Sequence, residues 1–364
     1  MSISVVIVTA KLRALGDQWR VYLRQCEGLI TTKVLPIFGP MKHISILIPK
    51  GAILGSIEGP RQLLTQINHF ANSRRQPALF KIQLVGLTKE TPISGGLYTI
   101  HCDFVLDEVK KTDLIIIPAV DGDLQTAMDA NKDFIPFINH HYANGAEVAS
   151  LCLGAFILAS TGLLDGKKCA THWLAANEFR KYFPSVQLID EKIITDEKGI
   201  YTSGGAYSYL NLILYLIEKY VGRELAILCA KVFAIEIERS NQLSFTIFQG
   251  QKGHDDEIIR KAQEFIEKNY HEKITVDQIA SMLALGRRNL ERRFRKATAN
   301  SVVEYIQRVK IEAAKLSLES SRENVNDAMY KVGYTDPKAF RVSFKKITGL
   351  SPLQYRNKYN RLAV

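Results

Sequence analysis

The sequence lacks the features that mark membrane and secreted proteins. No run of apolar residues approaches the roughly 20 that a membrane-spanning helix needs. The first residues contain no basic start followed by an apolar run and a small-residue cleavage site, which argues against a signal peptide. These two absences indicate a cytoplasmic protein that makes no contact with a membrane.

Cysteine is also scarce, and its pattern excludes two kinds of site. The five cysteines are scattered and odd in number, form no Cys-x-x-Cys pair and do not show the spacing of metal ligands. A reduced, cytosolic chain without a disulfide framework fits this pattern. We expect no metal and no cofactor. The cysteines are Cys26, Cys102, Cys152, Cys169 and Cys229.

What the sequence does contain is length and positive charge. Its 364 residues suit two domains rather than one. The net charge is +11, and residues 254–364 carry 22 Lys and Arg against 14 Asp and Glu, so that +8 of the charge lies in the last third. A module that binds the phosphates of nucleic acid needs such a concentration of basic charge. A solvated basic surface is the alternative that charge alone leaves open.

Strand and helix patterns alternate through the first two thirds of the chain. An early strand pattern at residues 3–8 has no regular continuation, so residues 1–42 are predicted to be an N-terminal extension, or sequence upstream of the native start. From residue 43 the alternation is typical of a parallel sheet covered by helices on both faces. The predicted strands are 43–49, 81–85, 113–118 and 147–151, and the predicted helices are 63–70, 154–160, 210–220 and 224–237.

A polar stretch separates this region from an all-helical one. Residues 238–253 are rich in Gln, Ser, Asn and Gly and are predicted to be a linker. The predicted organisation is therefore the extension at 1–42, an α/β domain at 43–237, the linker, and a helical domain at 254–364.

The helical region repeats itself at a spacing of 50 residues. In each copy an apolar pair at i and i+4 faces inward, with basic residues on the opposite side. A duplicated unit of this kind places two helices in successive turns of the DNA major groove, about 34 Å apart. The matched positions are Leu290 and Phe340, Phe294 and Phe344, Thr298 and Thr348, Ser301 and Ser351, and Tyr305 and Tyr355.

Turn and cap residues predict where the helices of each copy begin. A turn at 284–286 precedes the predicted helix 287–296, and residues 302–316 have the spacing of a connecting helix. In the second copy Asp336 is suited to cap a helix, and Pro337 to occupy its first position, where the missing N–H costs nothing.

Four motifs in this region are family signatures. They are Arg288-x-Leu290-x-Arg292-Arg293-Phe294, Gly333-Tyr334-x-Asp336, Phe340-x-x-x-Phe344-Lys345-Lys346 and Gly349-x-Ser351-Pro352-x-x-Tyr355-Arg356. Residues 256–358 thereby resemble the AraC/XylS family of regulators, which implies a double helix-turn-helix module that reads DNA with one helix of each copy. Lys310 and Val342 depart from the pattern, because Arg and a basic residue are common there. DNA contacts are predicted for Arg287, Arg288, Glu291, Arg292, Arg295, Pro337, Lys338, Arg341 and Lys345.

A further motif lies in the α/β region, around Cys152. Residues 147–155 read as strand, tight turn and helix, which is the layout of a nucleophile elbow with Cys152 at its apex. A position near a helix N-terminus favours the thiolate over the thiol. His172 follows twenty residues later, and residues 201–206 lead into another helix.

The run from Ala149 to Trp173 nearly reproduces a known family pattern. It resembles the class I glutamine amidotransferase-like (PfpI/isocyanide hydratase) superfamily, in the branch fused to AraC domains, and the resemblance covers about residues 43–235. It implies a flavodoxin-like fold with a small-molecule pocket at the elbow, where open α/β sheets bind ligands. The predicted effector pocket is lined by Cys152, Leu153, His172, Ser203 and Gly204.

Several residues argue against catalysis at this pocket. A thiolate nucleophile needs a base that a third group orients. Leu153 follows Cys152 where the superfamily's peptidases carry a His, and Ser56 stands where some relatives have a Glu that partners the cysteine. Ala119 and Val120 replace the small glycines that let backbone N–H groups approach the site. We therefore predict no catalytic residue.

The sequence thus predicts an α/β flavodoxin-like parallel-sheet sensor domain followed by an all-α double helix-turn-helix domain. The predicted function is that of a sequence-specific, ligand-responsive transcription regulator. Its predicted partners are double-stranded promoter or operator DNA, an unknown small-molecule effector, RNA polymerase and a second copy of the chain in a homodimer. Two alternatives stay open: a cysteine-dependent hydrolase or hydratase fused to a DNA-binding module, and an α/β domain that only mediates dimerisation.

Overall fold

The computed structural model describes residues 40–237 and 241–360. The strand expected over residues 3–8, and nearly all of the expected N-terminal extension, lie outside these residues. The strand expected at 43–49 is present as β1 (Lys42–Ile48). In the described part of the chain, none of the helices is both long and apolar enough to cross a bilayer.

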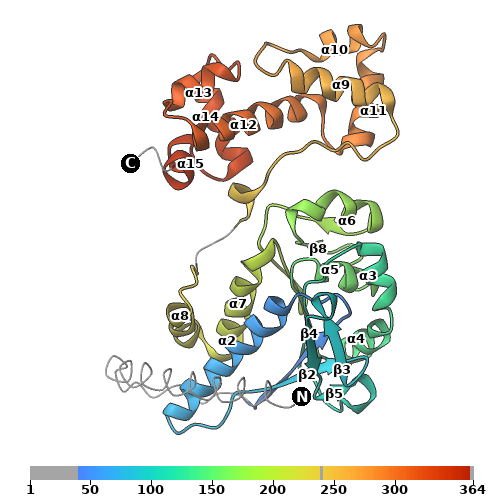
Figure 1. Cartoon of the computed structure of the whole chain (residues 1–364), viewed down its shortest axis with the longest axis vertical. Helices are drawn as coiled ribbons and strands as arrows, with labels where there is room; N and C mark the ends of the chain where they lie inside the picture. The colour runs from blue at the N-terminus through green and yellow to red at the C-terminus, as the bar shows by residue number, and fades with distance from the viewer. Residues whose placement is uncertain (1–39, 238–240, 361–364) are drawn as a thin grey trace. The chain divides into compact units, whose positions relative to one another are not determined.

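A seven-stranded sheet forms the centre of the α/β domain (Figure 1). Neighbouring strands are parallel, except that β10 and β11 are antiparallel. The sheet confirms the predicted strands and adds three short ones at its edges. In order across the sheet the strands are β10 (Ile194–Glu197), β11 (Ile200–Ser203), β7 (Glu147–Ser150), β6 (Leu114–Ile117), β1, β2 (Phe80–Gly86) and β5 (Phe104–Val105).

Helices cover both faces of this sheet, as the sequence predicts. The central strand β6 consists of four buried aliphatic residues, which is typical of a strand covered on both sides. Figure 1 shows α2, α7 and α8 on one face and α3, α4 and α5 on the other. Their bounds are α2 (Leu54–Ser73), α7 (Tyr209–Val221), α8 (Arg223–Val232), α3 (Leu124–Ala130), α4 (Phe134–Ala143) and α5 (Gly154–Ser160).

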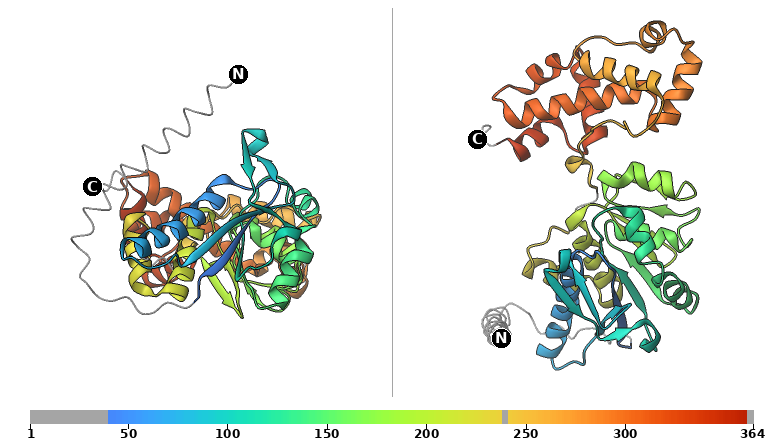
Figure 2. Two further views of the ribbon diagram at one scale, coloured as in Figure 1. Left: turned by 90° about the horizontal axis from the view of Figure 1, so that it is seen from below. Right: turned by 45° about the vertical axis from the view of Figure 1, so that its right-hand side comes forward.

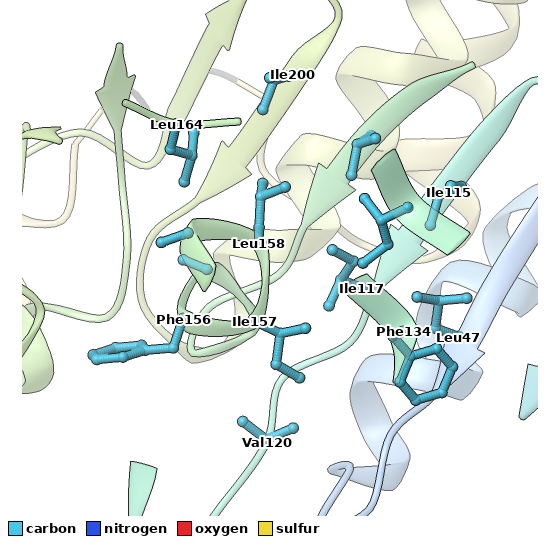
Figure 3. Packing of buried hydrophobic residues seen from close by; sticks show 14 of the residues in the cluster. Leu47, Ile115, Ile117, Val120, Phe134, Phe156, Ile157, Leu158, Leu164 and Ile200 are labelled. Atoms are coloured by element: carbon cyan, nitrogen blue, oxygen red, sulfur yellow. The ribbon is translucent and has the colours of Figure 1, made fainter. Parts of the chain in front are cut away.

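The second face holds the largest hydrophobic cluster of the domain. Figure 3 shows Leu47 and Ile117 of the sheet directed toward Phe134 of α4 and Ile157 of α5. All four side chains are at most 2% exposed. This packing fixes α5 against the sheet, and with it the turn at Cys152 that precedes α5.

Helix α8 is shorter than predicted. The sequence pattern extends to residue 237, but α8 ends at Val232. Ala234 has a φ of 52°, in the left-handed region, and the N–H of Ile235 donates to the carbonyl oxygen of Ala230. This hydrogen bond terminates the helix in the manner of a left-handed C-cap.

Two small sheets and a short helix complete the domain. Figure 2 shows the hairpin of β3 (Glu90–Ile93) and β4 (Tyr98–His101) standing off the main sheet. The strands β8 (Lys168–Cys169) and β9 (Gln187–Leu188) pair in parallel, with α6 (Ala176–Tyr182) between them in the chain.

In the described residues 254–360, seven α-helices form the helical domain, which Figures 1 and 2 show in orange and red. They enclose two hydrophobic clusters, one for each copy of the sequence repeat, and the long helix α12 contributes to both. The helices are α9 (Glu257–Lys268), α10 (Val276–Met282), α11 (Arg287–Thr298), α12 (Val302–Ser320), α13 (Val325–Lys331), α14 (Pro337–Thr348) and α15 (Pro352–Tyr359).

The 50-residue repeat in the sequence is a structural repeat. Thr298 Oγ1 donates to the carbonyl oxygen of Phe294, and Thr348 Oγ1 donates to that of Phe344, both at 2.8 Å. The rings of Phe294 and Tyr305 lie edge to face at 5.2 Å between centroids, and those of Phe344 and Tyr355 at 5.4 Å. Ser301 and Ser351 each form a capping box at the start of the following helix.

Candidate nucleic-acid interface and ligand site

Helix α11 presents a basic face to solvent. Leu290 and Phe294 are buried in the first cluster, whereas the predicted DNA contacts of this helix are all exposed. Arg287 also forms ion pairs, with Asp277 at 3.0 Å and with Glu291 at 3.3 Å. The exposed residues are Arg287, Arg288, Glu291, Arg292 and Arg295.

Helix α14 presents the equivalent face of the second copy. Asp336 caps it by accepting a hydrogen bond from the N–H of Lys338 at 2.8 Å, and Pro337 is its first residue, as predicted. Its inward residues Phe340 and Phe344 are buried, and Val342 on the outer face is 61% exposed. The predicted contacts Pro337, Lys338, Arg341 and Lys345 are exposed as well.

Two basic residues of this region have structural roles. Arg293, next to the exposed Arg292, donates to both carboxylate oxygens of Asp256, and this pair lowers the pKa of Asp256. Lys310 of α12 is buried, and its Nζ donates to the carbonyl oxygens of Glu272 at 3.0 Å and Val332 at 2.8 Å. Lys310 thereby links the first copy of the repeat to the second, a role that the sequence did not indicate.

Cys152 occupies the tight turn that the sequence predicts between β7 and α5. Its φ is 53°, in the left-handed region. Gly154, the first residue of α5, lies close to the end of β6. A Cβ at this position would lie 2.5 Å from the carbonyl oxygen of Pro118, so a larger residue would not fit. The backbone of Cys152 is held on both sides: its N–H donates to Ser203 Oγ at 3.2 Å, and its carbonyl oxygen accepts from Thr171 Oγ1 at 3.0 Å.

The protonation of Cys152 differs from the expectation. The helix N-terminus was expected to favour the thiolate, but burial raises the pKa of the Cys152 thiol to about 12, and the N–H of Leu153 offsets this only in part. Cys152 is 3% exposed. Desolvation disfavours the charged thiolate more strongly than a single backbone dipole favours it. The cysteine is therefore a neutral thiol at neutral pH.

His172 and Ser56 are likewise engaged in local hydrogen bonds. His172 Nδ1 accepts from the N–H of Leu174 at 3.1 Å, and burial lowers the pKa of the imidazole. The neutral ring then carries its proton on Nε2. Ser56 Oγ accepts from the N–H of Ala119 at 3.0 Å and donates to the carbonyl oxygen of Ile53 at 2.7 Å. Neither arrangement supplies a base for a thiol.

Of the predicted pocket residues, Cys152 and Ser203 are joined by a hydrogen bond and Gly204 follows Ser203 in the chain, and an unpredicted residue lies beside Gly204. Gln242 comes from the region predicted to be a linker, and its carboxamide lies against Gly204 and Gly205. A Cβ at Gly205 would lie 2.9 Å from Gln242 Oε1 and 3.7 Å from His172 Nε2. No local pattern marked Gln242, because its side-chain partners precede it by 37 to 71 residues.

Comparison with known proteins identifies both halves of the chain. The DJ-1/PfpI family matches residues 62–219, within the α/β domain. A helix-turn-helix domain family matches residues 279–358, within the helical domain.

Two curated regulators are similar to the chain over more than half of its length. The HTH-type transcriptional regulator GbdR of Pseudomonas aeruginosa is 24% identical over 245 residues, which are 66% of this chain and 66% of GbdR. The alignment thus spans just under two thirds of GbdR. The HTH-type transcriptional regulator CdhR of the same organism is 22% identical over 312 residues, which are 85% of this chain and 90% of CdhR.

Solved structures with similar folds cover about half of the chain. An AraC family transcriptional regulator from Pseudomonas putida has a TM-score of 0.44 and 16% identity, covering 53% of this chain and 100% of that one. DJ-1beta of Drosophila melanogaster has a TM-score of 0.44 and 18% identity, covering 54% of this chain and 100% of that one.

Proposed function

We propose that this chain, which joins a DJ-1/PfpI domain to an AraC-type helix-turn-helix domain, is a transcription regulator. It binds operator DNA with the helical domain and a small-molecule effector with the α/β domain. It acts in the cytoplasm as a homodimer, and it influences transcription through contact with RNA polymerase. Effector binding changes DNA binding only if the effector has different affinities for two states of the protein.

The repeated basic face is the observation that carries this proposal. Helices α11 and α14 occupy equivalent places in the two copies, and each exposes basic residues opposite a buried apolar pair. A helix of this kind fits the major groove, and two of them fit two successive turns of DNA. The relatives GbdR and CdhR, which are named as HTH-type transcriptional regulators, support this assignment.

The α/β domain binds a ligand in this proposal and does not transform it. The thiol of Cys152 is protonated at neutral pH, and Nδ1 of His172 accepts a hydrogen bond from the backbone N–H of Leu174. A cysteine nucleophile needs a thiolate and an oriented base, so this arrangement opposes the hydrolase or hydratase alternative. The left-handed turn at Cys152 is compatible with both roles and does not separate them.

Selection of DNA by the full-length protein tests the proposed function. We expect repeated rounds of binding from a random duplex pool to enrich one motif, with two half-sites about one helical turn apart. Enrichment of no motif, with binding that depends on salt alone, would show that the basic helices bind DNA without reading its sequence.

A further inference from the structure

The segment that follows the α/β domain contains a fully engaged glutamine. Gln242 is 1% exposed. Its Nε2 donates to the carbonyl oxygens of Asp190 at 2.7 Å and Thr171 at 3.0 Å, and its Oε1 accepts from the N–H of Gly205 at 2.7 Å. Both amide protons and the amide oxygen therefore have partners, as they would in a bound ligand.

Two glycines make room for this carboxamide. A Cβ at Gly204 would lie 2.8 Å from Gln242 Nε2, and one at Gly205 would lie 2.9 Å from Oε1. A side chain at either position would therefore occupy the place of the amide. The carboxamide thus lies against Gly204, a residue of the predicted effector pocket, and it contacts Thr171, whose Oγ1 donates to the carbonyl oxygen of Cys152.

The same segment contacts the helical domain. We call residues 241–248 the strap. The O–H of Tyr359 donates to the carbonyl oxygen of Ser244 at 3.0 Å, and Nζ of Lys315 donates to that of Thr246 at 2.5 Å. The short helix η5 (Leu243–Phe245), which follows Gln242 directly, contacts α14.

We infer that Gln242 is a built-in ligand of the α/β domain, and that the effector is a molecule with a primary carboxamide that displaces it. This inference rests on the proposed function, because it assigns the effector to that same site. Displacement releases the strap from the α/β domain. Helix α14, which η5 contacts, is then no longer tethered to the α/β domain through Gln242. A tethered competitor lowers the apparent affinity of a free ligand, since only the fraction of molecules with an empty site binds it.

The partners of Gln242 define the chemistry of the ligand. The two carbonyl oxygens of Thr171 and Asp190 require a donor of two hydrogens, and the N–H of Gly205 requires an acceptor beside it. A primary carboxamide satisfies both demands in one plane. A carboxylate of the same shape has no hydrogen to donate and would place its charge against two carbonyl oxygens.

Binding of a labelled peptide to the full-length chain tests this inference. The probe is a fluorescein-labelled Ala-Gln-Leu peptide with a methylated C-terminal amide, so that its glutamine side chain is its one primary carboxamide, and the matched probe carries Glu in the middle position. We expect the Gln probe to bind Gln242→Ala at least tenfold more tightly than wild type, and the Glu probe to bind neither. L-glutamine, but not L-glutamate, should displace the Gln probe. Gln249→Ala, at an exposed glutamine of the same region, should behave as wild type.

A second variant keeps Gln242 and blocks its site. In Gly205→Ala the new methyl group excludes the carboxamide, so backbone amides of residues 243–246 should exchange hydrogen faster than in wild type while those of α7 stay protected. Unchanged exchange, equal binding of the Gln and Glu probes, or failure of Gln242→Ala to bind the Gln probe would each overturn the inference. Because DNA selection by the wild-type chain is measured separately, its failure would refute the proposed function and would not be confused with these results.

Discussion

At the scale of single residues, the chemistry of Cys152 distinguishes an α/β domain that binds a ligand from one that catalyses a reaction. Its thiol is buried, with a pKa of about 12, and its backbone is held by Ser203 and Thr171. We expect Cys152→Ser to leave the melting temperature and the affinity for operator DNA unchanged, because the fold uses the backbone of this residue more than its sulfur. Alkylation of wild-type Cys152 by iodoacetamide should stay slow at neutral pH. Turnover of small amides or isocyanides that Cys152→Ser abolishes would instead establish an enzyme.

The exposed arginine and lysine residues of the helical domain are expected to contact different parts of DNA. Arg288 and Arg292 are exposed on α11, and we expect their guanidinium groups to contact DNA bases. Replacing either by Ala should weaken binding to the selected operator by about 1–3 kcal/mol and relax its sequence preference. Fluorescence anisotropy with operator and random duplexes measures both effects.

Lys345→Ala is the matched comparison on α14. It should reduce affinity for operator and random DNA alike and flatten the salt dependence, because a phosphate contact is independent of sequence. Lys181→Ala, at an exposed lysine of the α/β domain, serves as the control and should change neither. Equal losses on operator and random DNA for the two arginine variants would contradict their assignment to base reading.

At the scale of elements, α11 and α14 are equivalent in place but not in chemistry. Val342 stands 50 residues after Arg292, and Ala339 after Asn289, so two polar positions of α11 are apolar in α14. Arg292 donates to Asn289 at 3.0 Å, whereas Val342 is exposed and apolar. Arginine is suited to guanine, and an apolar side chain to the methyl group of thymine. We expect the α14 half-site to prefer thymine, and Val342→Arg to shift that base toward guanine in a repeated selection. An unchanged preference would show that this face does not contact bases.

A buried amine on α12 adds to the connection between the two copies. Lys310 donates to backbone carbonyls of both copies, and burial lowers the pKa of its amine. Lys310→Met should lower the free energy of unfolding by about 1–3 kcal/mol in urea titrations, because two buried carbonyl oxygens lose their donor. The variant should also lose selectivity for the spacing between half-sites. Full retention of both properties would mean that α12 alone holds the copies together.

Local patterns allowed most elements to be predicted, and non-local contacts account for what was missed. The i, i+4 pair Leu290 and Phe294, and the cap at Asp336, identify α11 and α14 because helix signals lie within one or two turns. The termination of α8 at Val232 and the place of Gln242 depend on the folded chain around them. The helix N-terminus at Cys152 gave the wrong protonation state, because the extent of burial decides the pKa and cannot be read from the sequence.

At the scale of the whole molecule, we expect the helical domain to determine which DNA sequence is bound and the α/β domain to raise the affinity through dimerisation. The helical domain has its own hydrophobic clusters, against which Phe248 also packs, so residues 241–364 should fold and select the same DNA motif as the full chain. Without the α/β domain the fragment should bind operator at least tenfold more weakly, because a dimer gains from a second, tethered binding event. Selection of a different motif by the fragment would show that the α/β domain contributes to sequence reading.

The long helix α12 also sets how the protein responds to the winding of its operator. It runs for 19 residues, about 28 Å at the rise of an α-helix, and it joins the two copies as one rod. Each base pair added between the half-sites rotates one relative to the other by about 34°, because a turn of DNA contains about 10.5 base pairs. Overwinding or underwinding the duplex produces the same misalignment without any change of sequence. Occupancy should therefore vary with superhelical density, and a promoter under this regulator would respond to the torsional state of the chromosome as well as to the proposed effector.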